Sequence, residues 1–211
     1  MSRHLTPETL VHIAGLSQVP SAPQDSVLLM IDGQREYTSG RLPLVGIDAA
    51  VEEGARLLAL ARSAGMPVFH AIHHGRPGAA LFEPSGDGAR FIDSLAAIPG
   101  ENVLVKSLPN AFAGTELGTR IRATGRRAIV IAGFATHMCV SATARVALDE
   151  GFRCRTMVSV RRSHQTGIPR PREWNNAEFA DSADFAENSK RAAMPLLKGR
   201  CRSSFSGFRA L

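Results

Sequence analysis

Three side chains suited to nucleophilic chemistry stand at or just after the ends of separate apolar runs: Asp32, Lys106 and Cys139. A thiol attacks well only when it is ionised, and a carboxylate can take its proton and later return it to a leaving amine. A nearby ammonium favours both anions. These three residue types together predict hydrolysis through a covalent bond to cysteine.

The segments that must position these residues alternate between short apolar runs and amphipathic stretches. The predicted strands are 26–31, 67–72, 102–106, 128–133 and 153–160. The predicted helices are 48–64, 89–97, 116–124 and 141–150. This order indicates right-handed βαβ units. We therefore predict an α/β, three-layer Rossmann-like fold, with a mostly parallel central sheet of five to six strands and helices on both faces.

Parallel strands bring their carboxyl ends to one edge of the sheet, where α/β proteins bind ligands. Asp32 and Lys106 end two of the strands, and Cys139 stands at the entrance to a predicted helix. We expect the helix terminus and Lys106 to favour the thiolate, and Lys106 to keep Asp32 ionised. Taken singly, each residue also has a structural interpretation: a buried apolar cysteine, a turn aspartate and a solvated lysine.

The sequence around these residues resembles a known family. Asp32-x-Gln34 after an apolar strand, the Ala-Phe-x-x-Thr-x-Leu of 111–117 and the Gly-Phe-Ala-Thr-His-Met-Cys-Val of 133–140 look like the isochorismatase-like cysteine hydrolases. That family includes nicotinamidases, N-carbamoylsarcosine amidases and isochorismatases. The resemblance implies that Asp32, Lys106 and Cys139 form a catalytic triad.

The resemblance also implies how a substrate is held. The amides of Ala135 and Cys139 would form an oxyanion hole, aimed by a non-proline cis peptide between Phe134 and Ala135. The substrate-binding residues that it implies are Gln34, His73, His74, Phe112, Phe134 and Thr136. For Phe112, a place in the core is an equal alternative.

The implied function is cleavage of a C–N bond in a small non-peptide amide through a thioester. Two alternatives stay open: hydrolysis of a vinyl ether, in which proton donation by Asp32 dominates, and a catalytically silent binding protein. The family's nicotinamidases bind a metal through Asp-x-His, whereas this chain has Ile72-His73-His74. We therefore expect no metal or other cofactor. The expected partners are a small-molecule substrate and further copies of the chain, in a dimer or tetramer.

Composition and charge argue against some classes of protein and favour one cellular compartment. The 211 residues carry a net charge of +6, but residues 1–150 have 13 Lys and Arg against 14 Asp and Glu, whereas 151–211 have 12 against 5. A basic excess confined to the end, without a recognised motif, argues against nucleic-acid binding. No apolar run has the length of a membrane helix, and residues 1–10 lack the apolar stretch of a secretory signal, so we expect none. Three cysteines without CxxC spacing suit a reducing cytoplasm.

These observations predict three parts of the chain: an N-terminal extension (1–25), the hydrolase domain (26–160) and an atypical basic segment (161–211). The last segment holds four Ile, Leu and Val among 51 residues, and it lacks the family's ending. Such a composition predicts poor packing. A change of reading frame near residues 154–161 would explain both features.

Overall fold

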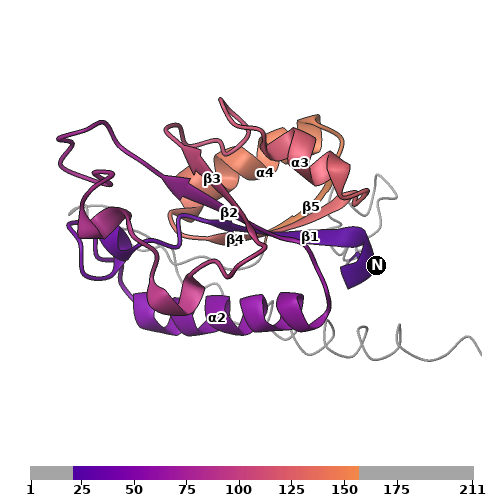
Figure 1. The fold of residues 1–211 in the computed structure, drawn as a ribbon, viewed down its shortest axis with the longest axis horizontal. Helices are drawn as coiled ribbons and strands as arrows, with labels where there is room; N and C mark the ends of the chain where they lie inside the picture. Colours follow the sequence, from indigo (N-terminus) through magenta and orange to yellow (C-terminus); the bar gives the residue numbers. More distant parts are fainter. Residues whose placement is uncertain (1–20, 157–211) are drawn as a thin grey trace, which may run out of the picture.

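The computed structural model describes residues 21–156. Five parallel strands form one sheet in the order β3-β2-β1-β4-β5 (Figure 1). The strands are β1 (Ser26–Ile31), β2 (Val68–His73), β3 (Asn102–Lys106), β4 (Ala128–Gly133) and β5 (Arg153–Thr156). The predicted fold class is confirmed in this part of the chain.

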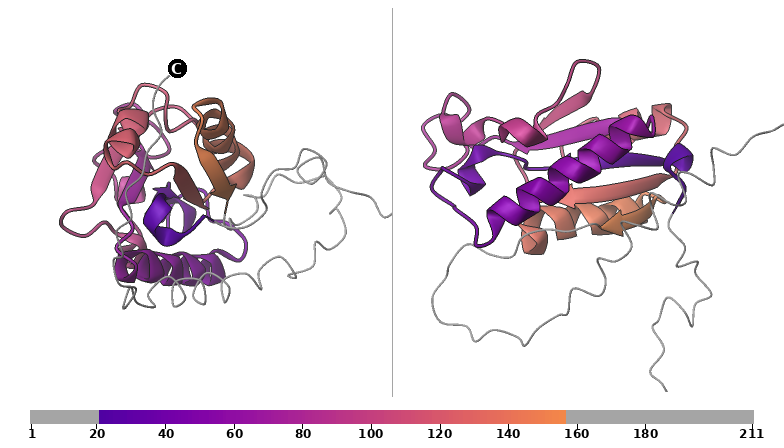
Figure 2. Two further views of the ribbon diagram at one scale, coloured as in Figure 1. Left: turned by 90° about the vertical axis from the view of Figure 1, so that its right-hand side faces the viewer. Right: turned by 90° about the horizontal axis from the view of Figure 1, so that it is seen from below.

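Helices cover the two faces of the sheet. Helix α2 (Ile47–Ser63) packs on one face, and α3 (Leu117–Ala123) and α4 (Ser141–Asp149) lie on the other (Figures 1 and 2). All six residues of β1 and of β4 are buried, as expected of strands that helices cover on both sides. Alternate residues of β1 therefore enter two separate apolar cores.

The predicted helix over 89–97 is wrong. The chain forms two short 3-10 turns there, Asp87–Ala89 and Asp93–Leu95. Between them, Phe91 pairs with Gln34 in an antiparallel bridge, and its carbonyl accepts a hydrogen bond from Arg35 Nε at 3.1 Å. Because its backbone is engaged by the segment that follows β1, it cannot continue a helical ladder.

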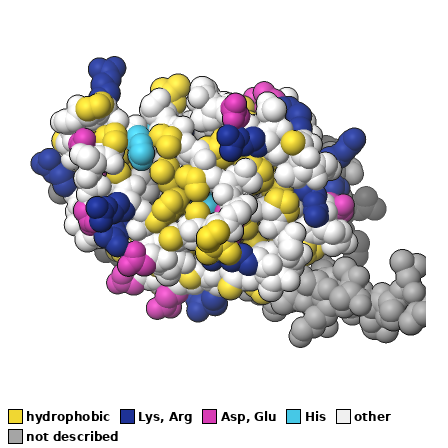
Figure 3. Space-filling model, viewed as in Figure 1, with side chains coloured by type: hydrophobic (Ala, Val, Ile, Leu, Met, Phe, Trp, Pro, Cys, Tyr) yellow, Lys and Arg dark blue, Asp and Glu magenta, His cyan; other side chains and the backbone are white. Residues whose placement is uncertain are grey.

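Strand β3 is one edge of the sheet, and Val103, Val105 and the nearby Leu108 are exposed there. Figure 3 shows hydrophobic side chains gathered across the middle of the face that it draws, with charged groups around them. An apolar sheet edge offers a surface to which another chain can bind.

Parts of the sequence predictions lie outside the described residues. These parts are most of the N-terminal extension, the end of the fifth predicted strand and the whole basic segment 161–211. Between residues 21 and 156, none of the helices combines the length and the apolar character that crossing a membrane requires.

Candidate active site

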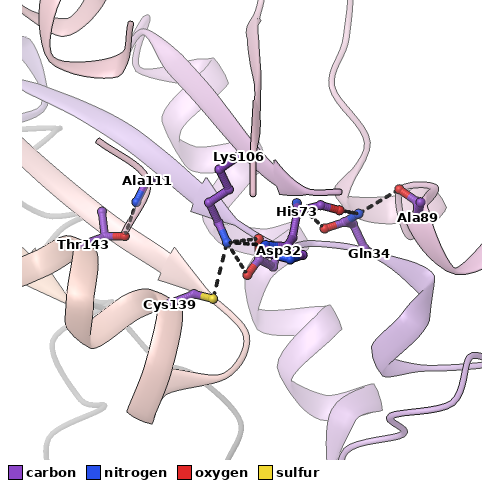
Figure 4. Close-up of polar contacts among 8 residues, drawn as sticks. All are labelled: Asp32, Gln34, His73, Ala89, Lys106, Ala111, Cys139 and Thr143. Atoms are coloured by element: carbon purple, nitrogen blue, oxygen red, sulfur yellow. Dashed lines mark hydrogen bonds and ion pairs between the residues drawn. The ribbon is translucent and has the colours of Figure 1, made fainter. Parts of the chain in front are cut away.

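The structure brings the three predicted catalytic side chains together in the protein interior (Figure 4). Lys106 Nζ donates hydrogen bonds to Asp32 Oδ2 at 3.1 Å and to Cys139 Sγ at 3.3 Å, and it lies 3.0 Å from Asp32 Oδ1. The side chains of Asp32 and Lys106 are 0% exposed, and Cys139 is buried. One ammonium is therefore within reach of both the carboxylate and the sulfur.

The strand order explains why these residues meet. Strand β1 lies between β2 and β4. After β1, the chain first adds β2 and β3 on one side of it and then crosses over to add β4 and β5 on the other side. Ligand sites of open α/β sheets lie at such a switch point. Asp32 follows β1 there, and its N–H donates to the carbonyl of Ala71 in β2 at 2.8 Å. Its φ of 53° is left-handed, a conformation that aspartate tolerates better than most residues.

Cys139 reaches the site through a tight exit from β4. Gly133 has a φ of 151°, and a Cβ there would lie 2.1 Å from the carbonyl oxygen of Ile31. Only glycine fits this approach between the two central strands. The chain then turns at Ala135 and forms a single π-helical turn (Thr136–Val140) before α4. Single π-helical turns are rare in proteins, and many of those that occur lie at functional sites.

The expected cis peptide before Ala135 is wrong, because the described residues contain no cis peptide bond. Ala135 instead has φ 54° and ψ 58°. This left-handed residue stands between β4 and the π-helical turn, so the backbone turns there with trans peptide bonds. The assignment of the Ala135 and Cys139 amides to an oxyanion hole stays a prediction.

Lys106 favours the thiolate of Cys139, as expected, but other effects outweigh it in the resting site. Burial, and next the charge of Asp32, raise the pKa of the Cys139 thiol to about 12, and Lys106 opposes this only in part. Burial likewise raises the pKa of Asp32, against the lowering effect of Lys106. The single ammonium of Lys106 therefore does not outweigh desolvation of the thiol and the charge of Asp32. The resting site holds a thiol beside a carboxylate whose proton affinity is increased.

His73 adds a fourth group to this cluster. Its Nδ1 lies 3.3 Å from Lys106 Nζ. Burial, followed by the charge of Lys106, lowers the pKa of His73. Because an ammonium only donates, Nδ1 is the acceptor, and the proton of the neutral ring is on Nε2. His74 continues the ladder between β2 and β3, since its N–H donates to the Lys106 carbonyl at 2.9 Å.

The amide of Gln34 is engaged by backbone groups. Its Nε2 donates to the carbonyls of His73 at 2.9 Å and Ala89 at 2.8 Å, and its Oε1 accepts the His73 N–H at 2.7 Å. The side chain thus joins the end of β2 to the segment before β3 (Figure 4). Its contacts give it a role in positioning His73.

The remaining predicted residues differ in their surroundings. The ring of Phe112 stacks on Phe152, with centroids 6.1 Å apart, at the amino end of β5. This contact favours the core alternative. Phe134 is buried, and its ring lies 5.7 Å from that of Tyr37. The Oγ1 atom of Thr136 is buried and has no hydrogen-bond partner within the described residues.

Two aromatic residues near the site were missed by the sequence analysis. Tyr37 is buried, and the charges of Asp32 and Cys139 add to burial in raising its pKa. Phe82 packs against the ring of His73 at 5.1 Å. The closeness of Tyr37 to Gln34 in the sequence is a signal that could have identified it. No local signal marks Phe82, because a long loop separates it from β2.

Metal chemistry has no candidate site in the described part of the chain. Residues 21–156 contain no group of three or more His, Cys, Asp and Glu side chains arranged to hold an ion. His70, which the sequence places on the same strand as His73, bonds Glu101 Oε2 through Nε2 at 2.9 Å.

Comparison with known proteins identifies the family of the chain. Residues 26–159 match the model of the isochorismatase domain. A secreted isochorismatase effector of Verticillium dahliae is 36% identical over 65% of this chain and 73% of its own length. A maleamate amidohydrolase of Pseudomonas putida is 37% identical, over 60% of this chain and 67% of its own. The crystal structure of a Pseudomonas putida isochorismatase superposes with a TM-score of 0.68 at 39% identity, covering 72% of this chain and 77% of the other.

Proposed function

The chain belongs to the isochorismatase family of hydrolases, and on this basis we propose that it cleaves a C–N bond of a small non-peptide amide through a thioester at Cys139. The contacts of Lys106 carry the proposal, because Nζ lies 3.3 Å from the sulfur and 3.0–3.1 Å from both carboxylate oxygens. When the thiol proton moves to Asp32, the negative charge moves from the Asp32 carboxylate to the Cys139 sulfur. The Lys106 ammonium is next to both groups, so the charge keeps its counter-ion. A proton transfer that is costly for an isolated buried thiol becomes accessible in this arrangement.

The first half of the reaction forms the thioester. As the Cys139 sulfur bonds to the carbonyl carbon, its proton passes to Asp32 and the carbonyl π electrons move to oxygen. The amides of Ala135 and Cys139 are the proposed donors to that oxygen. When the oxygen electrons re-form the carbonyl, the C–N bond breaks, and the Asp32 proton passes to the leaving amine.

The second half releases the acid. A water molecule gives a proton to Asp32 and bonds to the thioester carbon. The C–S bond then breaks, and the proton returns from Asp32 to the sulfur. Lys106 keeps its proton throughout, and the raised pKa of Asp32 suits a group that must alternate between base and acid. The unpartnered hydroxyl of Thr136 and the Nε2–H of His73 are the proposed donors to the substrate.

Names of relatives suggest the first substrates to test. One is a maleamate amidohydrolase and others are ureidoacrylate amidohydrolases, which act on small amides that carry a carboxylate. Wild-type protein should hydrolyse at least one such amide, and brief incubation followed by acid quenching should show the acyl group on Cys139 by mass spectrometry. Cys139→Ser should show neither the hydrolysis nor the acyl group on residue 139.

Cys154→Ser is the matched control, since Cys154 is a second thiol that the site does not include. Full turnover by Cys139→Ser would reject the thioester. Cleavage of a vinyl ether that survives alkylation of Cys139 would establish the alternative in which Asp32 acts mainly as a proton donor. The homo-oligomer and the cytoplasmic location also remain predictions, and light scattering after gel filtration tests the first.

A further inference from the structure

Backbone strain is concentrated around the catalytic residues. Among described residues other than glycine, those with positive φ are Asp32 (53°), Phe82 (52°) and Ala135 (54°). Asp32 and Ala135 belong to the site described above. For a bulky aromatic residue this conformation is an outlier, and such strain persists where the surroundings impose it, often at ligand-binding positions. Phe82 therefore requires an explanation.

A buried carboxylate holds Phe82 in this conformation. The N–H of Phe82 donates to Glu36 Oε2 at 3.1 Å, and its carbonyl accepts the Gly75 N–H at 2.8 Å. Glu36 is only 4% exposed, and its Oε1 accepts the N–H of Arg41 at 2.6 Å. The loop that carries Phe82 is thus fixed to the segment that follows Asp32.

This anchoring places the Phe82 ring against the active site. It meets the ring of His73 edge to face at 5.1 Å and that of Tyr37 at 5.4 Å. Tyr37 in turn lies 5.7 Å from Phe134, the residue before Ala135. We call Tyr37, Phe82 and Phe134 the aromatic cluster. It extends from His73, beside Lys106, to the turn that carries the proposed oxyanion hole.

The contacts of His73 define what it offers a ligand. Lys106 occupies Nδ1, and the edge-to-face contact with Phe82 restricts rotation of the ring. No hydrogen bond of Nε2 is formed within the described residues. A neutral histidine held in this tautomer donates through Nε2, so the matching ligand group is an acceptor such as a carboxylate or carbonyl oxygen.

We propose that Phe82 is a specificity-determining residue that contacts the acyl group of the substrate and orients His73 toward an acceptor on that group. The substrate class is then a flat, unsaturated small amide that carries a carboxylate, because aromatic rings pack best against planar groups. This inference rests on the proposed function and adds the choice of acyl group to it.

Maleamate and succinamate test the proposal, since they share length and charge and differ in the double bond. Wild-type protein should have a kcat/KM for maleamate at least about 10-fold above that for succinamate, and Phe82→Leu should bring this ratio to within about 3-fold of one. Phe82→Gly should do the same, although glycine adopts this backbone without strain. If Phe82→Gly kept the wild-type ratio of the two kcat/KM values, the backbone conformation and not the ring would determine substrate preference. That result would overturn the proposal.

Phe91→Leu is the matched control, because Phe91 lies in the same loop and makes an equivalent edge-to-face contact with His70, at 5.4 Å. It should leave the ratio unchanged. An equal change with Phe91→Leu and Phe82→Leu would also overturn the proposal, as it would indicate a general effect on the loop.

A binding measurement separates this proposal from the proposed reaction. In a Cys139→Ser background, calorimetry should show tighter binding of maleate than of succinate, and Phe82→Leu should remove the difference. This result would support Phe82 even if the wild-type protein hydrolysed no amide, in which case only the proposed function would fail. The role of Phe82 would be overturned if maleate and succinate bound with equal affinity when Phe82 is present, or if Phe82→Leu left their difference in affinity unchanged. It would also be overturned if neither diacid bound measurably.

Discussion

The ammonium nitrogen of Lys106 lies 3.3 Å from the sulfur of Cys139, although β3 and β4, which deliver the two residues, are separated in the sheet by β1 and β2. Lysine spans this distance because its side chain is long, and here that side chain is fully buried. The same nitrogen holds the carboxylate of Asp32, so its removal should affect both folding and chemistry.

Lys106→Met should leave the Asp32 carboxylate buried without a cation. We expect the free energy of unfolding to fall by about 3–5 kcal/mol, as for other broken buried pairs, and hydrolysis to become undetectable. Urea denaturation measures the first effect. The double variant Asp32→Asn with Lys106→Met should regain much of the stability and none of the activity. A double variant no more stable than the single one would contradict this interpretation of the pair.

Alkylation of Cys139 should report its raised pKa. With a pKa of about 12, the rate with iodoacetamide should keep rising about tenfold per pH unit from pH 8 to pH 10, where an ordinary thiol levels off. Asp32→Asn removes a like charge and should therefore lower this pKa and speed alkylation at pH 8.5. Peptide mapping in a Cys154→Ser, Cys201→Ser background assigns the signal. A plateau below pH 9 in wild-type protein would contradict the prediction.

Glu101 should make folding sensitive to acid. Arg62, the Ile98 N–H and His70 all bond its carboxylate, which is 9% exposed, and they lower its pKa from 4.5 to about 2 in spite of burial. A lowered pKa stabilises the fold above pH 4.5, and this stabilisation is lost as pH falls toward 2. Glu101→Gln should therefore cost about 3 kcal/mol at pH 7 and about half of that at pH 3.

Glu53→Gln provides the comparison for Glu101. Glu53 pairs with Arg56 on the surface of α2, where both side chains are largely exposed. Its replacement should change the free energy of unfolding by less than about 1 kcal/mol. Denaturant titrations at both pH values measure the two variants, and an equal cost of Glu101→Gln at pH 7 and pH 3 would contradict the linkage to its carboxylate.

Gly133→Ala should disrupt the exit from β4. The added methyl would lie 2.1 Å from the Ile31 carbonyl oxygen, and neither strand can move without breaking the ladder between them. We expect a loss of more than about 3 kcal/mol, seen as a lower thermal midpoint. Gly54→Ala is the control, because that position lies in α2 and a methyl there meets only the flexible ends of two side chains, Leu95 at 3.1 Å and Met30 at 3.8 Å. Similar midpoints for the two variants would contradict the steric argument.

The sequence predicted the sheet and the meeting of Asp32, Lys106 and Cys139 because both depend on patterns repeated along the chain. Apolar runs identify buried strands, and the parallel arrangement places their ends at one edge. The same reasoning failed for the helix over 89–97, where Gln34 and Arg35 engage the backbone at Phe91. Such a contact between distant segments leaves no periodic signal.

Electrostatic properties were harder to predict than positions. A helix terminus and Lys106 indicated a thiolate at Cys139, but desolvation is the larger effect, and its size depends on how completely neighbouring segments cover the sulfur. Phe82 was missed for a related reason, since its place beside His73 follows from the tether to Glu36 rather than from its own surroundings in the chain.

The Glu36 carboxylate also bears on how this protein can diversify. It contributes to the link between two loops by accepting the N–H groups of Arg41 and Phe82. Main-chain donors are supplied by every amino acid except proline, so most side chains in either loop can be exchanged while the tether survives. New substrate preferences can thus arise by replacing single loop residues, whereas loss of this one acid would remove a main-chain contact from both loops at once.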